Sequence, residues 1–307
     1  MNEQYLKIFE KIDFNKIIDH PNILIAAAFW EDDRYQAART CYKYMRAIDD
    51  LIDCHKSTHT HIAITEKKQF RESVENWIAM ARNAGAGIPG QHELLDTIHK
   101  FHIPVWPMEA FAQSMLYDID HDGFASLQDF IDYSQGASVA PASIFVHLNG
   151  LRKNGTEYLE PAFDVRSAAT PCALFSYFVH IIRDFQKDQM NNLNCFAHEV
   201  TLKNGLTAND LREIAAGGLV PAGFRRIVEE YCRYADTYRR QTLEIMDKIA
   251  PLLEPRYRLS LQIIFNLYLM VYERIDVEKG SFTTNELNPT PAEIRKRVYE
   301  TMASFKD

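Results

Sequence analysis

An arginine and three aspartates share one face of a predicted helix near residues 42–53 (YKYMRAIDDLID). Arg46, Asp49, Asp50 and Asp53 occur at positions i, i+3, i+4 and i+7, which places them in one stripe on an α-helix. One interpretation is a solvated polar stripe in which Arg46 pairs with an aspartate one turn away. The other is a group of carboxylates that binds a hard divalent cation.

A second acidic pair interrupts an apolar segment in the middle of the chain. Residues 171–184 are apolar at nearly every position, which is typical of a helix enclosed by protein. His180, Asp184 and Asp188 nevertheless recur every four residues on one face, with Tyr177 one turn earlier. An unpaired carboxylate in an apolar interior costs several kcal/mol or becomes neutral, so both aspartates need cations nearby. The adjacent arginine, residue 183, supplies only part of that charge.

The two acidic stripes complete each other if their helices face across a cavity that holds Mg²⁺ and a diphosphate. Magnesium is a hard octahedral ion, held by a few carboxylates together with phosphate oxygens and water. Neutralising the leaving diphosphate lowers the barrier for breaking an allylic carbon–oxygen bond. An apolar helical bundle would hold the prenyl chain and exclude water from the carbocation. The sequence therefore predicts magnesium-dependent isoprenoid diphosphate chemistry, with Mn²⁺ as an alternative ion.

Both acidic segments resemble the aspartate-rich motifs of squalene and phytoene synthases, in the same order and with a similar separation. YKYMRAIDDLID resembles the first motif, and residues 182–188 (IRDFQKD) resemble the second. Residues 132–141 (DYSQGASVAP) are similar to the tyrosine-led stretch of small residues in which a helix of that family passes close to the substrate. The resemblance covers roughly residues 20–275. It implies an all-α isoprenoid (terpenoid) synthase fold, with a single helical bundle around a central cavity.

The resemblance also implies roles for individual residues. Metal ions would be bound to the diphosphate by Asp49, Asp53, Asp184 and Asp188, which together with Arg46 and Tyr133 form the implied catalytic set. The implied substrate-binding residues are His20, Arg46, Asp50, Tyr133, Tyr177, His180, Arg183 and Tyr268. The implied activity joins two prenyl diphosphates head-to-head, farnesyl or geranylgeranyl units, through a cyclopropyl intermediate to a squalene- or phytoene-type product. A requirement for NADPH is left open.

The chain departs from that family in two places. Tyr177 and His180 stand where a glutamine and an asparagine are usual. Residues 189–196 (QMNNLNCF) contain no arginine, where the family has a basic loop. Fewer diphosphate contacts are therefore expected, and a single-substrate terpene synthase, cyclase or prenyl diphosphate hydrolase remains the alternative. His180 is more often a satisfied core residue than a ligand, because imidazole is not a preferred ligand of magnesium.

Residues 118–129 (DIDHDGFASLQD) carry a competing signal. They match an EF-hand calcium loop at positions 1, 3, 5, 6 and 9, with an aspartate at position 12. An EF-hand-like calcium-binding protein is therefore a further alternative. An acidic turn between two helices, with Ser126 as the N-cap of the second, explains the same residues more simply.

These residues need helices to position them, and helical periodicity dominates the whole chain, with no convincing period-two alternation. The breaks at 85–90, 149–156 and 191–194 are interpreted as loops, so one all-α domain over residues 1–307 is expected. Helices are expected at residues 3–18, 33–54, 64–83, 107–120, 126–149, 166–189, 207–216, 222–250, 255–276 and 291–304.

Composition narrows the class of protein further. A formal net charge of −8 argues against nucleic acid as a partner. Five cysteines without CxxC spacing fit a reducing cytoplasm. The first residues lack the apolar core of a signal peptide, and no run reaches the roughly 18 apolar residues of a membrane span. The expected partner is a prenyl diphosphate, with no transmembrane segment. Peripheral membrane contact for product release and the oligomeric state are left open.

Overall fold

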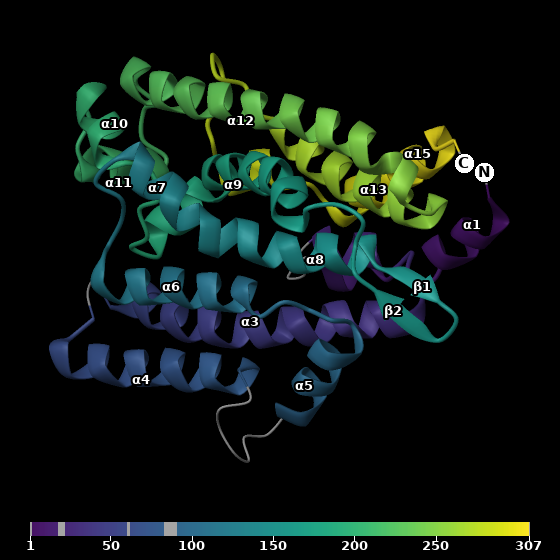
Figure 1. Cartoon of the computed structure of the whole chain (residues 1–307). Coiled ribbons are helices and arrows are strands. Elements are labelled where there is room, and N and C mark those ends of the chain that lie inside the picture. The colour runs from purple at the N-terminus through teal and green to yellow at the C-terminus, as the bar shows by residue number, and fades with distance from the viewer. Residues whose placement is uncertain (1, 18–21, 60–61, 83–90, 307) are drawn as a thin grey trace.

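The computed structural model describes residues 2–17, 22–59, 62–82 and 91–306. The described chain is almost entirely helical (Figure 1). Its elements are α1 (Glu3–Phe9), η1 (Phe14–Ile17), α2 (Asn22–Ala27), α3 (Asp32–Thr58), α4 (Ile64–Ala81), α5 (Gln91–Lys100), α6 (Trp106–Asp120), α7 (Leu127–Ser134), η2 (Gln135–Val139), α8 (Ala140–Gly150), β1 (Arg152–Asn154), β2 (Glu157–Leu159), α9 (Val165–Met190), α10 (His198–Lys203), α11 (Ala208–Ala215), α12 (Ala222–Ile249), η3 (Ala250–Leu252), α13 (Pro255–Tyr272), α14 (Thr284–Leu287) and α15 (Pro291–Ser304).

The all-α prediction is confirmed, and the differences lie in short elements. The prediction missed α2, α5, α10 and α14, and the helix expected at 3–18 is split into α1 and η1. The break expected at 149–156 is partly a β-hairpin, with β1 and β2 antiparallel and Arg152 opposite Leu159. Each strand has three residues, too few for a period-two pattern. Gly155, with φ of +63°, allows the tight turn between them.

The helix α9 is the centre of the bundle. It packs against α12 on one side and α8 on the other, and also contacts α11 and α13. In Figure 1, α12 lies above α9, whereas α3, α6 and α4 form the lower layers. The side chain of Asp164 caps the start of α9 by accepting a hydrogen bond from Ser167 N at 2.6 Å. Neighbours on several faces explain why the helix is apolar nearly all round.

By length and composition, α9 could also cross a membrane. This is weak evidence for a span, because the core helix of a folded protein passes the same test. Its most apolar stretch is 56% buried inside the protein. We therefore attribute the apolar character of α9 to its central position in the bundle.

The helix expected at 126–149 is continuous but contains a π-helical segment. It runs through α7, the π-helix η2 and α8, and the π segment shifts the faces that α7 and α8 present. Gly136 lies in this segment against α6, where an added Cβ would come within 2.2 Å of Ala110 O. Ser138 Oγ donates to Ala173 O at 2.9 Å and ties the segment to α9. The π-helix thus brings α6, α8 and α9 close together.

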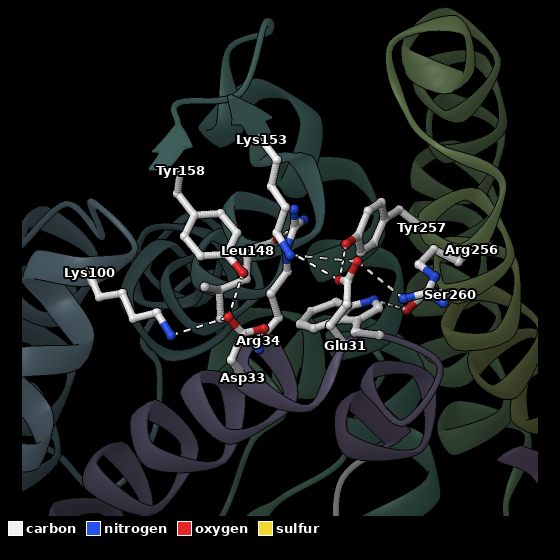
Figure 2. A network of polar contacts seen from close by, with 11 residues as sticks. Glu31, Asp33, Arg34, Lys100, Leu148, Lys153, Tyr158, Arg256, Tyr257 and Ser260 are labelled. Carbon is white, nitrogen blue, oxygen red and sulfur yellow. Dashed lines mark hydrogen bonds and ion pairs between the residues drawn. The ribbon is translucent and has the colours of Figure 1, made fainter. Parts of the chain in front are cut away.

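A buried arginine joins the start of α3 to three other parts of the chain (Figure 2). The side chain of Arg34 is 0% exposed, and its Nη1 donates to Leu148 O at 3.0 Å at the end of α8. Its guanidinium lies 4.3 Å from the ring of Tyr257 and 5.1 Å from the ring of Tyr158. Glu31 Oε2 is 3.7 Å from Arg34 Nε. These contacts offset part of the loss of hydration of the guanidinium, whose Nε and Nη2 have no hydrogen-bond partner among the described residues.

Charged residues surround this arginine and connect the same elements (Figure 2). Asp33 accepts hydrogen bonds from Tyr158 Oη at 2.7 Å and from Lys100 Nζ at 3.2 Å. Arg256, in the first turn of α13, lies 3.2 Å from the Glu31 carboxylate. The start of α3 is therefore linked to α5, α8, the β-hairpin and α13.

Candidate active site

Two adjoining cavities lie among α3, α6, η2, α8 and α9. One has a volume of about 300 Å³ and is lined by acidic residues, and the other, of about 320 Å³, is mostly apolar. Six aspartates line the acidic cavity: Asp49, Asp53, Asp118, Asp122, Asp184 and Asp188. The two aspartate-rich stripes therefore open onto the same space.

The helix α3 contributes the first side of the acidic cavity. Arg46 pairs with both Asp49 and Asp50, so both local ion pairs of the solvated-stripe interpretation exist. Asp50 has a side chain that is 52% exposed, and it lines neither cavity. Asp53 follows Asp49 one turn later and lies in the open part of the acidic cavity. Lys56, one turn further, is buried in its wall.

The helix α9 contributes the opposite side. Asp184 accepts two hydrogen bonds from Arg183, at 2.8 Å from Nε and 2.6 Å from Nη2. Asp188 lies one turn later, and the thiol of Cys195 lies 3.6 Å from its Oδ2. Arg183 itself lines neither cavity. The predicted face of α9, with His180, Asp184 and Asp188 spaced four residues apart, therefore lines the cavity. Arg183 lies outside the cavity and is the counter-ion of Asp184.

The helix α6 adds a carboxylate that the sequence interpretation assigned to another site. Tyr133 Oη donates to Asp118 Oδ2 at 2.6 Å, and both residues line the acidic cavity. Burial raises the pKa of Asp118 to about 6, although the charge of Lys56 and the hydrogen bond from Tyr133 act against this rise. Asp118 therefore faces the acidic cavity, together with the aspartates of α3 and α9.

Electrostatics in this cavity oppose full ionisation of its acids. Burial raises the pKa of the Asp49 carboxyl to about 7, and the neighbouring charge of Asp53 adds to the rise. Burial also raises the pKa of Asp188 to about 7, with a further contribution from the charge of Asp184. For Asp184 burial acts in the same direction, but the Arg183 guanidinium holds its pKa below the ordinary value. A bound cation would relieve the repulsion among these carboxylates.

The donor chemistry of the acidic cavity fits magnesium. Six carboxylates face two cationic side chains, Arg46 and Lys56, so negative charge is in excess. Among the described residues, no group of three or more His, Cys, Asp or Glu side chains is already close enough to hold a metal ion. A lining of carboxylates suits Mg²⁺, which usually keeps waters and takes phosphate oxygens as ligands beside one or two carboxylates.

The apolar cavity continues from the acidic one. Arg46, Asp49, Ala137, Tyr177 and His180 line both. Beyond them the walls are apolar side chains of α3, α8, α9, α12 and α13, among them Met45, Ala142, Phe145, Ala169, Met246 and Ile264. An amphiphile with an anionic head and a hydrocarbon tail would match this arrangement.

His180 stands at the junction of the two cavities. Its ring packs edge-on against Tyr268, with the centroids 5.2 Å apart, and burial lowers its pKa to about 3, so the imidazole is neutral at physiological pH. Within the described part of the chain, its buried Nε2 has no hydrogen-bond partner. The expectation of a satisfied core histidine is wrong in this respect.

The cavities bring together most of the residues singled out from the sequence. Asp49, Asp53, Asp184, Asp188, Arg46, Tyr133, Tyr177 and His180 line the acidic cavity, and Tyr268 lines the apolar one. Asp50 and Arg183 are the exceptions: neither lines a cavity, and each forms an ion pair with a residue that does, Asp50 with Arg46 and Arg183 with Asp184. His20 lies outside the described residues.

The calcium-loop interpretation of residues 118–129 is wrong. Asp118 and Asp120, at loop positions 1 and 3, lie in the last turn of α6 and point to different partners. Asp118 faces the acidic cavity, whereas Asp120 pairs with Arg71 of α4. Asp129, at position 12, accepts a hydrogen bond from the backbone N of Ser126 at 2.8 Å. Ser126 is the N-cap of α7, as expected, and Asp129 closes its capping box.

The sequence interpretation did not assign Asp118, Asp122, Lys56 or Cys195 to this site. The acidic run at 118–122 was a usable signal, since two of its aspartates line the cavity. Lys56 was detectable too, because it continues the stripe of Asp49 and Asp53 by another turn. Cys195 lies in an irregular segment that carries no periodic signal.

Comparisons with known proteins give a consistent result. A profile of the squalene/phytoene synthase family matches residues 21–297, whereas no curated protein sequence matches the chain. A dehydrosqualene synthase crystallised with a ligand is similar with a TM-score of 0.68 and 15% identity, over 99% of each chain.

Two further solved structures share this architecture. The squalene synthase HpnC from Alicyclobacillus acidocaldarius has a TM-score of 0.53 and 14% identity, over 89% of this chain and 98% of that one. YisP from Bacillus subtilis subsp. subtilis strain 168 has a TM-score of 0.61 and 13% identity, over 97% of this chain and 99% of that one. At these identities the likeness shows the fold, which is the all-α isoprenoid synthase fold.

Proposed function

The chain belongs to the squalene/phytoene synthase family and is a prenyl-transferring enzyme, and we propose that it condenses two molecules of farnesyl or geranylgeranyl diphosphate head-to-head in a Mg²⁺-dependent reaction. The observation that carries the proposal is the pair of adjoining cavities. The acidic one suits a metal-bound diphosphate, and the apolar one suits a prenyl chain. Arg46 and Asp49 line both, at the point where the head and tail of such a substrate would meet.

The residues of the acidic cavity would bind and orient the diphosphate. Asp49, Asp53, Asp184 and Asp188 would hold magnesium together with phosphate oxygens. When bound, Mg²⁺ would neutralise the developing charge of the leaving diphosphate. Arg46 would be able to exchange one of its two aspartate partners for a phosphate oxygen, because its guanidinium has five donors.

The apolar cavity would protect the cation that ionisation leaves behind. Both electrons of the broken carbon–oxygen bond depart with the diphosphate, so an allylic cation remains among the apolar walls. The rings of Tyr177 and Tyr268 line the cavity and can face such a cation. In the condensation, the double bond of the second substrate supplies the electrons of the new carbon–carbon bond, and a proton lost from carbon closes the cyclopropane. Exclusion of water prevents capture of the cation before that step.

A second candidate function is the ionisation of a single prenyl diphosphate to a cyclised or hydrolysed product. The observation that favours it is His180, whose unpaired Nε2 lies at the junction of the cavities. A neutral imidazole can accept a hydrogen bond from a water molecule and position it beside the cation. Condensation needs water to be absent from this position.

Incubation of the purified protein with each prenyl diphosphate and Mg²⁺, followed by mass analysis of extracted products, tests the proposal. Products with twice the carbon number of the substrate are expected, and a parallel reaction with NADPH shows whether they are reduced. Products with the carbon number of the substrate would select the second candidate. Substrate that remains intact in every reaction would refute both. The Asp188→Asn variant is the control for activity from contaminants.

A further inference from the structure

Lys56 is a buried cation in the wall of the acidic cavity. It lies on α3 one turn after Asp53, and the residue is 7% exposed. Its Nζ donates to His121 O at 2.7 Å, in the segment after α6. The ring of His121 stacks on Tyr117 with the centroids 3.9 Å apart, which fixes the position of this carbonyl. The ammonium is therefore held at a defined place beside the carboxylates.

The ammonium retains hydrogen-bonding capacity that the protein does not use. An ammonium group has three donors, and the bond to His121 O uses one. Among the described residues Lys56 Nζ forms no ion pair with a carboxylate, although its charge acts to lower the pKa of Asp53 and of Asp118 from a greater distance. Burying a charge without a full set of partners is costly, so an additional partner is expected.

The two arginines near the site already form ion pairs with aspartates. Arg46 pairs with Asp49 and Asp50, and Arg183 pairs with Asp184 and lines neither cavity. The segment 189–196 brings asparagines and a cysteine to the cavity and no basic residue. A diphosphate in the acidic cavity would thus meet Lys56 as a cation that has no carboxylate partner among the described residues, whereas Arg46 already has two.

We propose that Lys56 binds the diphosphate group of the substrate directly. This inference rests on the proposed function and adds a residue to it. A lysine ammonium is a common phosphate ligand because it is a compact, strongly hydrated point charge with rotatable donors. Lys56 therefore supplies positive charge from the protein on the side of the cavity formed by α3.

A purely structural role is the competing explanation. In that case Lys56 would only hold the segment after α6 through His121 O, and its charge would only attenuate the repulsion among the aspartates. Lys56→Gln separates the two, because the amide keeps a donor for a carbonyl but removes the charge. Lys56→Met removes both, and Lys56→Arg keeps both.

Titration calorimetry of inorganic diphosphate in the presence of excess Mg²⁺ measures the contact without turnover. We expect Lys56→Met and Lys56→Gln to weaken diphosphate binding on the order of 10-fold or more, because a charge-assisted hydrogen bond is lost. Lys56→Arg is expected to stay within a few-fold of the wild type. The matched control is Lys187→Met, which removes the same charge from an exposed residue next to Asp188 that does not line the cavity. It is expected to change affinity less than Lys56→Met.

The outcomes separate this inference from the proposed function. A wild type that binds no diphosphate with Mg²⁺ would refute the proposed function and the role of Lys56 together. Wild-type affinity in Lys56→Met and Lys56→Gln would refute the role of Lys56 alone. Equal losses in Lys187→Met and Lys56→Met would also overturn it, because the effect would then be one of long-range charge. Circular dichroism of each variant establishes that it is folded.

Discussion

Arg183 holds Asp184 through two hydrogen bonds, and among the described residues no cationic side chain lies within 4.0 Å of Asp188, one turn further along α9. The pKa values of these two aspartates, which belong to one motif, are therefore shifted in opposite directions. The guanidinium outweighs the effect of burial and keeps the pKa of Asp184 low. Burial and the charge of Asp184 raise the pKa of Asp188 to about 7.

Replacement of these two aspartates by asparagine should have opposite effects on the stability of the metal-free protein. At pH 8, Asp188→Asn should raise the free energy of unfolding on the order of 1–3 kcal/mol, because it removes a charge that the fold disfavours. Asp184→Asn should lower it by a similar amount, because it leaves Arg183 without its partner. Urea denaturation of each variant beside the wild type measures the difference.

The pH dependence of that difference is a separate check. A carboxyl whose pKa is raised by folding reduces stability progressively as pH rises from about 4 to about 7. The advantage of Asp188→Asn should therefore grow over this range. The disadvantage of Asp184→Asn should be complete by about pH 5, because the folded-state pKa of Asp184 is low and its unfolded carboxyl is ionised by then. A difference for Asp188→Asn that is constant from pH 5 to pH 8 would contradict this account. Both variants should lose turnover.

Mg²⁺ and diphosphate together should stabilise the protein by more than the sum of their separate effects. Each supplies the charge that makes binding of the other favourable, because diphosphate alone must approach an excess of carboxylates. At about 100 times the dissociation constant, the stabilisation would be near 2.7 kcal/mol. Thermal unfolding with each ligand and with both, in wild type and Asp49→Asn, measures it. Additive shifts in the wild type would count against a shared site.

A larger side chain at Ala142 should shorten the apolar cavity. Ala142 lines it from α8, beyond the π-helical segment. Ala142→Phe should reduce kcat/KM for geranylgeranyl diphosphate more than for farnesyl diphosphate, by roughly 10-fold or more, since a pocket rejects what exceeds its volume. Diphosphate binding with Mg²⁺ should not change, because Ala142 does not line the acidic cavity. Equal losses with both substrates would show that the residue does not limit chain length.

A methyl group at Gly136 should destabilise the fold. The added Cβ would lie 2.2 Å from both Ala110 O and Ser114 Oγ, so α6 and the π-helical segment would have to separate. Gly136→Ala should cost about 1–3 kcal/mol, as overpacking in a rigid interior does. The midpoint of urea unfolding reports this cost. Ala137→Gly, at the next position in the same π-helical segment, is a control that adds no atoms.

The sequence predicted the two acidic faces because helical periodicity alone determines which residues of one helix lie together. Asp49 with Asp53, and Asp184 with Asp188, needed no further information. The partners from other elements could not be obtained in that way. Asp118 and Tyr133 meet across α6 and α7, and the packing of α6 against its neighbours places Asp118 at the cavity and Asp120 beside Arg71 of α4. The predicted helix at 107–120 ends where α6 does, so the calcium-loop match rested on residue types alone and not on the faces to which Asp118 and Asp120 point.

Hydrophobic periodicity could not predict the short and irregular elements either. The π-helical segment at 135–139 carries no local signal that separates it from an α-helix, and it lies where α6 approaches closely at Gly136. The β-hairpin is held against α3 by Tyr158 and Lys153, which contact Asp33 and Glu31. These contacts join residues far apart in the sequence, so no local sequence pattern predicts them.

The contacts that hold the start of α3 lie far along the helix axis from its acidic face. Arg34 is anchored at one end by contacts to three other parts of the chain, and Asp49 lies 15 residues further on, about 22 Å along the axis at 1.5 Å per residue. A tilt of about 2° around Arg34 would displace the Asp49 carboxylate by about 0.8 Å. A small rotation about the anchored start of α3 would therefore move its acidic face relative to α9 much more than it would move the contacts of Arg34.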